Sequence, residues 1–460
     1  MKNVARVAAL LVAMATGSAV TPAAASDRLC DASFENCRTP LLDLIRNERV
    51  GIDVAFWFME DNRYVAALVE RFRAGVPVRI IMDTEANTDY PLNAQSLEQL
   101  KNAGIPMREK YTGGIAHWKT MIFAGQHKVE FSGANYSPHA FVPVTPYLDY
   151  IDEVIYFTDT PSIVNSFMTM YDNHWADAVG YHNYANVKSL ARKYPTYPID
   201  PQLLFVPEKD FGGRSVKFYN LETAGIDSIM FRITDRRHAD ALIAAKRRGV
   251  RVRLITEPGQ YRDPARLWHS WNVDRMYVAG VTIRHRKHLG NTHQKSTILK
   301  SQLTTVFGSS NWTSPSATSQ LEHNIFTTNP LFYNFFTAQF ERKWGNLTGN
   351  KETTAFVPLP PDTPSKPSPV NGATGQAVSV TLKWYGGPWA HRYDVYFGTD
   401  PAALAKVVSN AEWGPSETKS AMKTFAVANL AKGRTYYWKV VARTMASKTA
   451  TSPVWSFKTK

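Results

Sequence analysis

One set of polar residues occurs twice in this chain with the same internal spacing. His117-Trp118-Lys119 and His293-Gln294-Lys295 are two H-x-K triplets, and each is followed by a glycine turn that ends in Asn135 or Asn311. The two asparagines are separated by the same number of residues as the two histidines. Because chance rarely reproduces both letters and spacing, the sequence predicts an internal duplication.

The duplication extends well beyond the triplets. Gly51-Ile52-Asp53 reappears as Gly225-Ile226-Asp227, and Glu153 has a later counterpart in Glu322. We therefore expect two repeats of similar fold, the first over residues 26–197 and the second over residues 198–350.

The pattern of apolar residues indicates the class of fold. In each repeat an amphipathic stretch precedes a short apolar run, as Tyr64–Ala74 precedes Val78–Met82 and Ala239–Gly249 precedes Val252–Ile255. Strands that alternate with helices favour an α/β fold, with a mixed or largely parallel sheet flanked by helices.

The repeated side chains suit phosphodiester chemistry. A neutral imidazole can attack phosphorus, and a second, protonated imidazole can give its proton to the departing oxygen. Lys119 and Lys295 would supply fixed positive charge, and the amides of Asn135 and Asn311 would donate hydrogen bonds to the phosphate oxygens. Lys stands two residues after His, so both side chains would share one face of a strand.

Each imidazole also needs a carboxylate on its other nitrogen, and Glu153 and Glu322 are the candidates, with ordinary strand-edge carboxylates as the alternative. This scheme requires no metal and no cofactor. The run His285–His288 together with His293 could be read as a metal cluster, but the intervening Arg and Lys repel a cation and no Cys joins them.

With two H-x-K triplets, two asparagine turns and two later glutamates, the chain resembles the phospholipase D superfamily over about residues 40 to 345. The resemblance implies two similar α/β halves around one active site and a phosphohistidine intermediate, with His117 as nucleophile and His293 as general acid. One departure is that the family's Asp, five residues after the Lys, is replaced by Ala124 and Lys300.

The N-terminal segment predicts export. Residues 1–25 combine two basic residues, an apolar run and the small-residue site Ala23-Ala24-Ala25, as in a secretory signal peptide, so we expect a secreted protein. No later stretch is apolar for long enough to span a membrane. Cys30 and Cys37 are the only cysteines, and export favours a disulfide between them.

The C-terminal part has a different composition. Residues 351–367 are rich in proline and predict an extended linker. Residues 368–460 alternate apolar and polar positions and resemble a fibronectin type III domain, an all-β sandwich, with Trp384 in its core and Tyr436 at its tyrosine corner.

The positive charge is concentrated in this last module. The whole chain has a formal charge of +14, and residues 368–460 hold twelve Lys or Arg against four acidic residues. The excess either solubilises the module or attaches it to an anionic surface.

We therefore interpret the chain as a secreted, monomeric phosphodiesterase that cleaves phospholipids between phosphate and head group. The aromatic segments Ala55–Phe58 and Pro138–Phe141 are candidates for contact with lipid. A metal-independent endonuclease with the same catalytic residues is the first alternative. A catalytically inactive surface-binding protein is the second.

Overall fold

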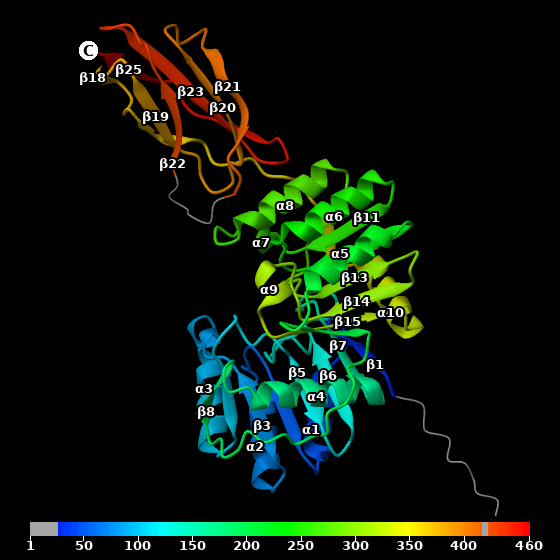
Figure 1. Ribbon diagram of the computed structural model, residues 1–460. Helices are drawn as coiled ribbons and strands as arrows, with labels where there is room; N and C mark the ends of the chain where they lie inside the picture. The colour runs from blue at the N-terminus through cyan, green and yellow to red at the C-terminus, as the bar shows by residue number, and fades with distance from the viewer. Residues whose placement is uncertain (1–25, 416–421) are drawn as a thin grey trace, which may run out of the picture.

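The computed structural model describes residues 26–415 and 422–460, so the predicted signal peptide, residues 1–25, lies outside the described residues. Figure 1 shows two α/β halves stacked along the molecule and a β-rich module at one end, next to the second half. The disulfide predicted between Cys30 and Cys37 is present. Among the described residues, no helix combines the length and the apolar character that crossing a membrane would require.

Each half is built on a sheet of eight strands. The first sheet runs, in spatial order, β1 (Arg28–Asp31), β7 (Val154–Thr158), β6 (Lys128–Ser132), β5 (Thr120–Phe123), β2 (Ile52–Ala55), β3 (Val78–Met82), β4 (Met107–Lys110) and β8 (Tyr181–Ala185). The second runs β9 (Leu203–Val206), β15 (Glu322–Thr327), β14 (Thr304–Gly308), β13 (Lys295–Leu299), β10 (Gly225–Met230), β11 (Arg251–Thr256), β12 (Thr282–Arg286) and β16 (Thr353–Ala355). The two orders are the same, strand for strand.

Both sheets are mixed, as the alternation of helices and strands predicted. Three neighbouring strands are parallel in each half, with Ile52 opposite Val78 in the first and Ile226 opposite Val252 in the second. The H-x-K strands β5 and β13 are antiparallel to β2 and β10. The duplication therefore extends to the register of the strands.

The helices are duplicated as well. The first half contains α1 (Arg38–Asn47), α2 (Asn62–Arg73), η1 (Glu85–Thr88), α3 (Pro91–Asn102) and α4 (Pro161–Ala176). The second contains α5 (Phe211–Leu221), α6 (Arg236–Arg247), α7 (Pro258–Tyr261), α8 (Leu267–Val278), α9 (Ser314–Thr318) and α10 (Pro330–Gly345). Asp61 and Asp235 cap the N-termini of α2 and α6, and left-handed glycines Gly75 and Gly249 follow their C-termini.

One apolar cluster joins the two halves. It contains Phe167 of α4 and Phe336 of α10, and it also contains Phe131 from the first sheet and Phe307 from the second. Trp118, at the centre of the first H-x-K triplet, is fully buried in this cluster. Because the faces of both sheets contribute, burial of apolar surface holds the halves together.

The linker starts later than the sequence indicated. Residues 353–355, which the linker prediction of 351–367 included, form β16 and pair with β12. Phe356 is buried in the apolar core of the second half. Ser365–Ser368 is already strand β17 of the C-terminal module. Proline content marked this stretch as extended, but an extended segment can equally pair at a sheet edge.

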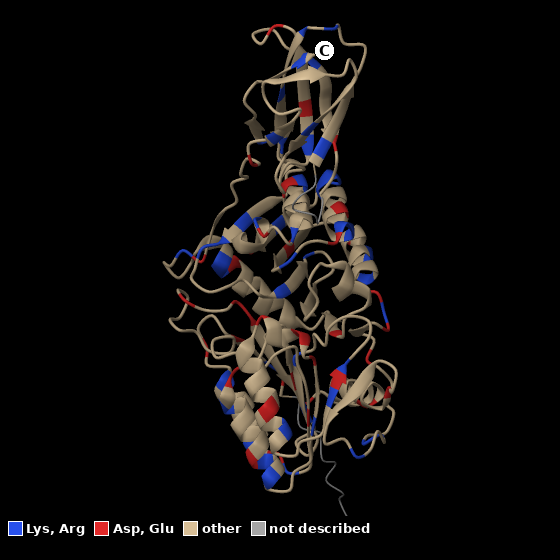
Figure 2. Ribbon diagram, turned by 90° about the vertical axis from the view of Figure 1, so that its left-hand side faces the viewer, with Lys and Arg blue, Asp and Glu red and all other residues tan. Residues whose placement is uncertain are grey.

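The C-terminal module is all-β. Its strands are β17 (Ser365–Ser368), β18 (Ala373–Gln376), β19 (Val380–Tyr385), β20 (Arg392–Gly398), β21 (Ala405–Glu412), β22 (Met422–Val427), β23 (Thr435–Arg443), β24 (Thr449–Thr451) and β25 (Trp455–Thr459). Trp384 and Tyr436 belong to its core, and the Tyr436 hydroxyl accepts a hydrogen bond from the backbone N–H of Ala431. Figure 2 shows basic residues spread over this module.

Candidate active site

The two H-x-K triplets meet where the halves pair with each other. Ala116, which precedes His117, forms a parallel bridge with Leu321, and Thr292, which precedes His293, forms one with Asp152. The backbone N–H of His117 donates to Leu321 O over 3.0 Å, and that of His293 donates to Asp152 O over 3.2 Å. Each histidine is therefore fixed beside the residue that precedes the other half's glutamate.

This pairing crosses the histidines and the glutamates. His117 Nδ1 lies 2.8 Å from Glu322 Oε2, and His293 Nδ1 lies 2.5 Å from Glu153 Oε1. Both carboxylates are fully buried. A carboxylate on Nδ1 holds the proton there and leaves Nε2 of the neutral ring with a free lone pair. Neither half is complete alone, because each imidazole is oriented by a carboxylate of the other half.

The two lysines turn back onto their own triplets. Lys119 Nζ donates to His117 O over 2.7 Å, and Lys295 Nζ donates to His293 O. Lys295 Nζ also lies 3.5 Å from Glu153 Oε1. Burial lowers the pKa of Lys119 well below its ordinary value, and burial, partly offset by Glu153, lowers the pKa of Lys295 to about 8.

The asparagine turns differ between the halves. Asn135 and Asn311 are both buried, and in the described part of the chain their side-chain oxygens have no hydrogen-bond partner. In the second half Ser309 Oγ donates to Glu322 Oε2 over 2.5 Å. The equivalent residue of the first half is Gly133, where a Cβ would come within 2.8 Å of Glu153 Oε2.

The two carboxylates therefore differ in their protonation. Burial would raise the pKa of Glu153, but the charge of Lys295 and the hydrogen bond from His293 outweigh burial and lower it. Burial dominates at Glu322 and raises its pKa to about 7 despite Lys119. Of the two pairs, the His293 pair contains the carboxylate with the stronger preference for negative charge.

Both imidazoles are held neutral in the free protein. Burial and then Lys119 lower the pKa of His117 well below its ordinary value. Burial and then Lys295, opposed by Glu153, lower the pKa of His293 to about 4. A bound anion would offset the lysine charges, and His293 is the histidine that already faces an ionised partner.

Two further carboxylates position the triplets, and sequence analysis missed them. Asp83 Oδ2 accepts the backbone N–H of Ala116 over 3.0 Å, and Glu257 Oε2 accepts that of Thr292 over 2.9 Å. Asp83 and Glu257 occupy equivalent positions at the ends of β3 and β11. Their equivalence was a usable signal, but the letters differ and so the repeat was not apparent.

The turn after each H-x-K strand is held by a glutamate, where the family's Asp is replaced by Ala124 and Lys300. Glu48 Oε1 accepts the backbone N–H of Gly125 over 2.8 Å, and Glu222 Oε1 accepts that of Ser301 over 2.8 Å. Lys300 Nζ lies 3.2 Å from Asp227 Oδ2. These contacts hold the ends of the two H-x-K strands at the positions where the family's Asp is replaced.

The aromatic segments proposed for lipid contact are mostly core. Phe56 and Phe141 belong to the apolar core of the first half, and Phe58 stacks on Tyr90 with ring centroids 3.7 Å apart. The expectation that these segments form an apolar surface is therefore wrong for those rings.

The histidine side chains that precede His293 pack against aromatic rings and do not form one cluster. His288 stacks on Tyr150 at 3.8 Å between ring centroids, and His285 packs against Phe356. Within residues 26–415 and 422–460, no group of three or more His, Cys, Asp or Glu side chains is arranged to hold a metal ion.

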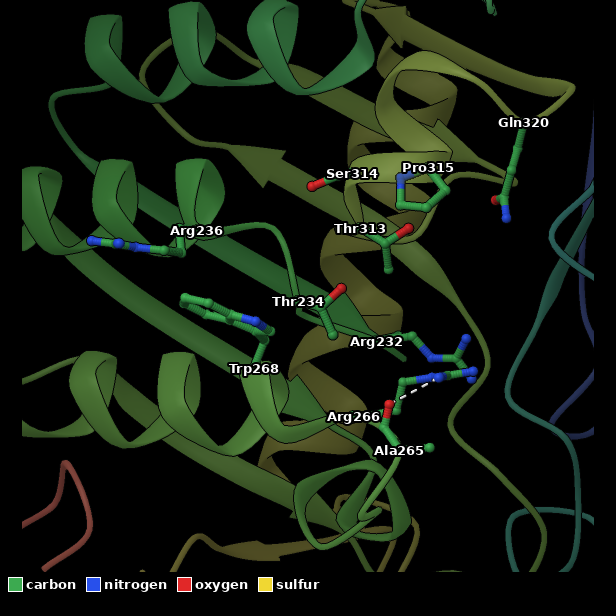
Figure 3. Close-up of a pocket in the computed structure, with 10 residues that line it drawn as sticks. All are labelled: Arg232, Thr234, Arg236, Ala265, Arg266, Trp268, Thr313, Ser314, Pro315 and Gln320. Carbon is green, nitrogen blue, oxygen red and sulfur yellow. Dashed lines mark hydrogen bonds between the residues drawn. The ribbon is translucent and has the colours of Figure 1, made fainter. Parts of the chain in front are cut away.

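A cavity of about 460 Å³ lies beside the paired triplets, and its lining includes Arg232, Arg236, Arg266 and Trp268 (Figure 3). Gln320 lines it too, and the next residue, Leu321, accepts the N–H of His117. The cavity therefore lies next to the segment that pairs with His117, and neither H-x-K triplet lines it.

Known proteins with a similar sequence are named cardiolipin hydrolases. The chain is 28% identical over 131 residues to the mitochondrial cardiolipin hydrolase of Chlamydomonas reinhardtii, covering 28% of this chain and 56% of that protein. It is 28% identical over 156 residues to the human mitochondrial cardiolipin hydrolase, covering 34% and 59%. The chain thus spans less than two thirds of either relative.

Two solved structures share the fold. Phosphatidylserine synthase from Haemophilus influenzae Rd KW20 superposes with a TM-score of 0.55 at 14% identity, covering 72% of this chain and 87% of that one. Polyphosphate kinase from Porphyromonas gingivalis gives 0.51 at 14% identity, covering 72% and 48%.

A family model described as "Cardiolipin synthase, PLD-like domain" matches residues 41–175 and 223–344. Those ranges hold both H-x-K triplets and both glutamates, and together they make up more than half of the chain. The chain belongs to this cardiolipin synthase, phospholipase D-like family.

Proposed function

We propose that this protein hydrolyses phospholipids between the phosphate and the head group through a phosphohistidine intermediate. The observation that carries the proposal is the crossed pairing of His117 with Glu322 and of His293 with Glu153. It leaves two imidazole Nε2 atoms to serve one site between two buried lysines.

His117 Nε2 attacks phosphorus in the first step, a P–N bond forms, and the P–O bond to the head group breaks. His293 gives its proton to the departing oxygen. In the second step His293 takes a proton from water, the water oxygen attacks phosphorus, and the P–N bond breaks. Lys119, Lys295 and the two asparagine amides offset the charge on the phosphate oxygens.

The difference between the two pairs supports these roles. Glu153 prefers negative charge and therefore stabilises a protonated His293, which a general acid needs. Glu322 has a pKa of about 7 and stabilises a protonated His117 less, which suits a nucleophile.

The relatives support a lipid substrate, since two of them are named cardiolipin hydrolases. Vesicles of phospholipid, given to the purified protein in chelator with added ethanol, test the proposal. A phosphoenzyme can pass its phosphatidyl group to a small alcohol, so we expect phosphatidylethanol beside phosphatidic acid. Release of free head group without any phosphatidylethanol would contradict a covalent intermediate open to ethanol.

A metal-independent nuclease is the second candidate, and the arginine-lined cavity beside the site favours it. The same preparation offered single- and double-stranded DNA distinguishes the two. Shortened DNA with intact lipid would replace the lipid assignment and retain the catalytic residues.

We also propose that the protein is exported as a monomer and that its C-terminal module is of the fibronectin type III kind. The tyrosine-corner hydrogen bond of Tyr436 supports the module's identity. Its basic residues support attachment to an anionic surface.

A further inference from the structure

The first half contains an insertion beside the active site that the second half lacks. Asn135 and Glu153, on either side of it, are 18 residues apart. Their counterparts in the second half, Asn311 and Glu322, are 11 residues apart, so the connection from β6 to β7 holds seven additional residues. The catalytic scheme uses the two halves alike and does not require this length, so the insertion needs another explanation.

The inserted stretch is apolar and uncharged. Residues 140–148 contain no charged side chain, and Val144 and Leu148 are 55% and 46% exposed. In the shorter connection of the second half the large apolar residues, Trp312 and Leu321, are fully buried. Exposure of large apolar side chains at this connection is therefore a feature of the first half alone.

Two other segments bring further apolar side chains to the same place. Leu289, which is 59% exposed, donates its backbone N–H to Leu148 O over 2.8 Å. Tyr147 donates its backbone N–H to Ser33 O over 2.8 Å, and its ring stacks on that of the exposed Phe34 with centroids 5.1 Å apart. Together these side chains form an apolar patch, which consists of Phe34, Val144, Tyr147, Leu148 and Leu289.

The apolar patch is held in place by contacts of its own. Asp149 closes a tight turn, because its N–H donates to Thr145 O over 2.9 Å and its carbonyl accepts the N–H of Thr145 over 3.0 Å. The Arg342 guanidinium lies over the rings of Phe34 and Tyr147, at 5.7 and 5.0 Å from their centroids. A surface that is already ordered loses little conformational entropy when a partner covers it.

The apolar patch lies at a short and fixed distance from the active site. Asp149 and Leu289 form a parallel bridge, and three residues later on both segments Asp152 and Thr292 form another. His293 comes four residues after Leu289, a separation of at most about 15 Å. Whatever covers the apolar patch is therefore adjacent to the substrate of the active site.

Exposed lysines border the apolar patch. Lys287, two residues before Leu289, donates its backbone N–H to Glu352 O over 2.8 Å, and Lys351 precedes that glutamate. Both lysine side chains are exposed. Apolar side chains bordered by lysines suit a bilayer of anionic phospholipid, because the apolar groups enter the acyl boundary and the ammonium groups stay with the phosphates. Entry by about 5–10 Å brings the H-x-K triplets to the level of the head groups.

We propose that the apolar patch docks the active site on the surface of a phospholipid bilayer. This inference rests on the proposed function and deepens it, since it names the surface from which the substrate is taken. Docking through apolar side chains differs from attachment through the basic C-terminal module, because salt screens the attraction between charges and does not screen apolar burial.

Binding of the full-length protein to vesicles of phosphatidylglycerol and phosphatidylcholine tests the proposal. The measurement is made in about 1 M salt, which shortens the Debye length to about 3 Å and so removes the attraction of the C-terminal module. We expect Leu148→Asp and Leu289→Asp each to lower the partition coefficient by about tenfold or more. Absence of wild-type binding in this salt, or equal binding by the wild type and both variants, would overturn the proposal.

Leu331→Asp is the matched control. Leu331 is 40% exposed at the start of α10, beyond the end of β15 opposite to Glu322, so it lies away from the active site. The substitution introduces the same charge at a similarly exposed leucine and should leave the partition coefficient unchanged. A loss as large as that of Leu148→Asp would show that any added negative charge weakens binding, and would contradict a role for the apolar patch.

A lipid that forms no bilayer separates docking from catalysis. Dibutyryl phosphatidylglycerol, kept monomeric in water, presents the same head group without a surface. We expect Leu148→Asp and Leu289→Asp to lower kcat/KM on vesicles by about tenfold or more, and to keep the wild-type value on the monomeric lipid and on bis(4-nitrophenyl) phosphate. Equal losses on vesicles and monomers would overturn docking. Vesicle binding that depends on Leu148 without cleavage of either lipid would retain docking and refute the proposed function.

A second copy of this chain is the competing occupant of the apolar patch. Sedimentation equilibrium without lipid distinguishes the two, and we expect the wild type and Leu148→Asp both to be monomers. A wild-type dimer that Leu148→Asp dissociates would overturn the proposal in favour of self-association.

Discussion

Each imidazole of the H-x-K triplets is oriented from the opposite half of the molecule. His117 depends on Glu322 and His293 on Glu153, and a bridge beside each pair fixes the backbone at the same point. A change at one glutamate therefore acts on the chemistry of the other half's histidine. The two histidines can be told apart experimentally because their partners differ in charge preference.

The leaving group should separate the two roles. A 4-nitrophenolate departs with little need for a proton, whereas an alkoxide head group needs one. We expect His293→Ala and Glu153→Gln to slow cleavage of an alkyl phosphodiester by about a hundredfold or more, and to slow bis(4-nitrophenyl) phosphate much less. His117→Ala should abolish both. Steady-state rates on the two diesters are the measurement. Equal losses on both diesters for His293→Ala would contradict the assignment of His293 as the general acid.

The dependence of activity on pH should be shifted from that of ordinary histidines. Burial and lysine charge lower the pKa of His293 to about 4 and that of His117 well below its ordinary value. Both histidines therefore gain and lose their protons at acid pH. Lys295, with a pKa of about 8 because of burial, loses its charge as pH rises through that value.

We therefore expect kcat/KM to decline as pH rises through about 4, because His293 loses the proton that a general acid needs, and to fall further above about pH 8, where Lys295 loses its charge. A profile measured from pH 4 to 10 in chelator checks this, and the apparent pKa values belong to the coupled groups. An acid limb centred at pH 6.5 or higher would show that the imidazoles are not desolvated as described.

Glutamates Glu48 and Glu222 hold equivalent turns in the two halves. Glu222 Oε1 accepts three backbone N–H groups, those of Ala224, Gly225 and Ser301. Burial raises the pKa of Glu222, but these bonds outweigh it and bring the pKa to about 2. A lowered pKa stabilises the fold above the ordinary carboxyl pKa, and that contribution is lost as pH falls toward about 2.

Glu222→Ala should lower the free energy of unfolding at pH 7 by about 1–3 kcal/mol, because three backbone N–H groups, of which that of Gly225 is buried, lose their acceptor. Urea unfolding at pH 7 measures the change. Glu98→Ala, at an exposed position on α3, is the control and should change it by no more than about 0.5 kcal/mol. Equal effects of the two substitutions would mean that the turn does not depend on its carboxylate.

At the scale of the whole molecule, the linker and the C-terminal module contact the second half. Arg262 donates to the carbonyl oxygens of Leu359 and Pro360, and its guanidinium lies 4.9 Å from the Trp389 ring centroid. The stretch between Phe356 and β17 therefore carries contacts of its own, and the position of a truncation matters.

A chain that ends at Pro364 should keep the activity of the full-length protein on a soluble diester. A chain that ends at Glu352 should be less stable by about 3–5 kcal/mol, because it loses β16 and the buried Phe356. Thermal unfolding and turnover of bis(4-nitrophenyl) phosphate measure both effects. Both truncated chains should bind anionic vesicles more weakly than the full-length protein does. Added salt should weaken the binding of the full-length protein. Full binding by the chain that ends at Pro364 would show that the module's charge serves solubility alone.

The sequence alone determined the repeated parts. The H-x-K triplets, the asparagine turns and the paired glutamates recur with fixed spacing, so the duplication and the α/β class could be inferred without coordinates. The disulfide followed from the only two cysteines. These features are local in sequence or repeated along it, and so they leave a readable pattern.

Only the tertiary structure decided how the halves combine. Spacing could not show that Glu322 serves His117, because the pair is formed by strands that are distant in sequence and meet between the two sheets. It also could not show that β16 completes the second sheet, that Phe58 stacks on Tyr90, or that Arg232 and Arg266 line one cavity. Non-local pairing is fixed by how whole faces pack, and no short stretch of sequence encodes that packing.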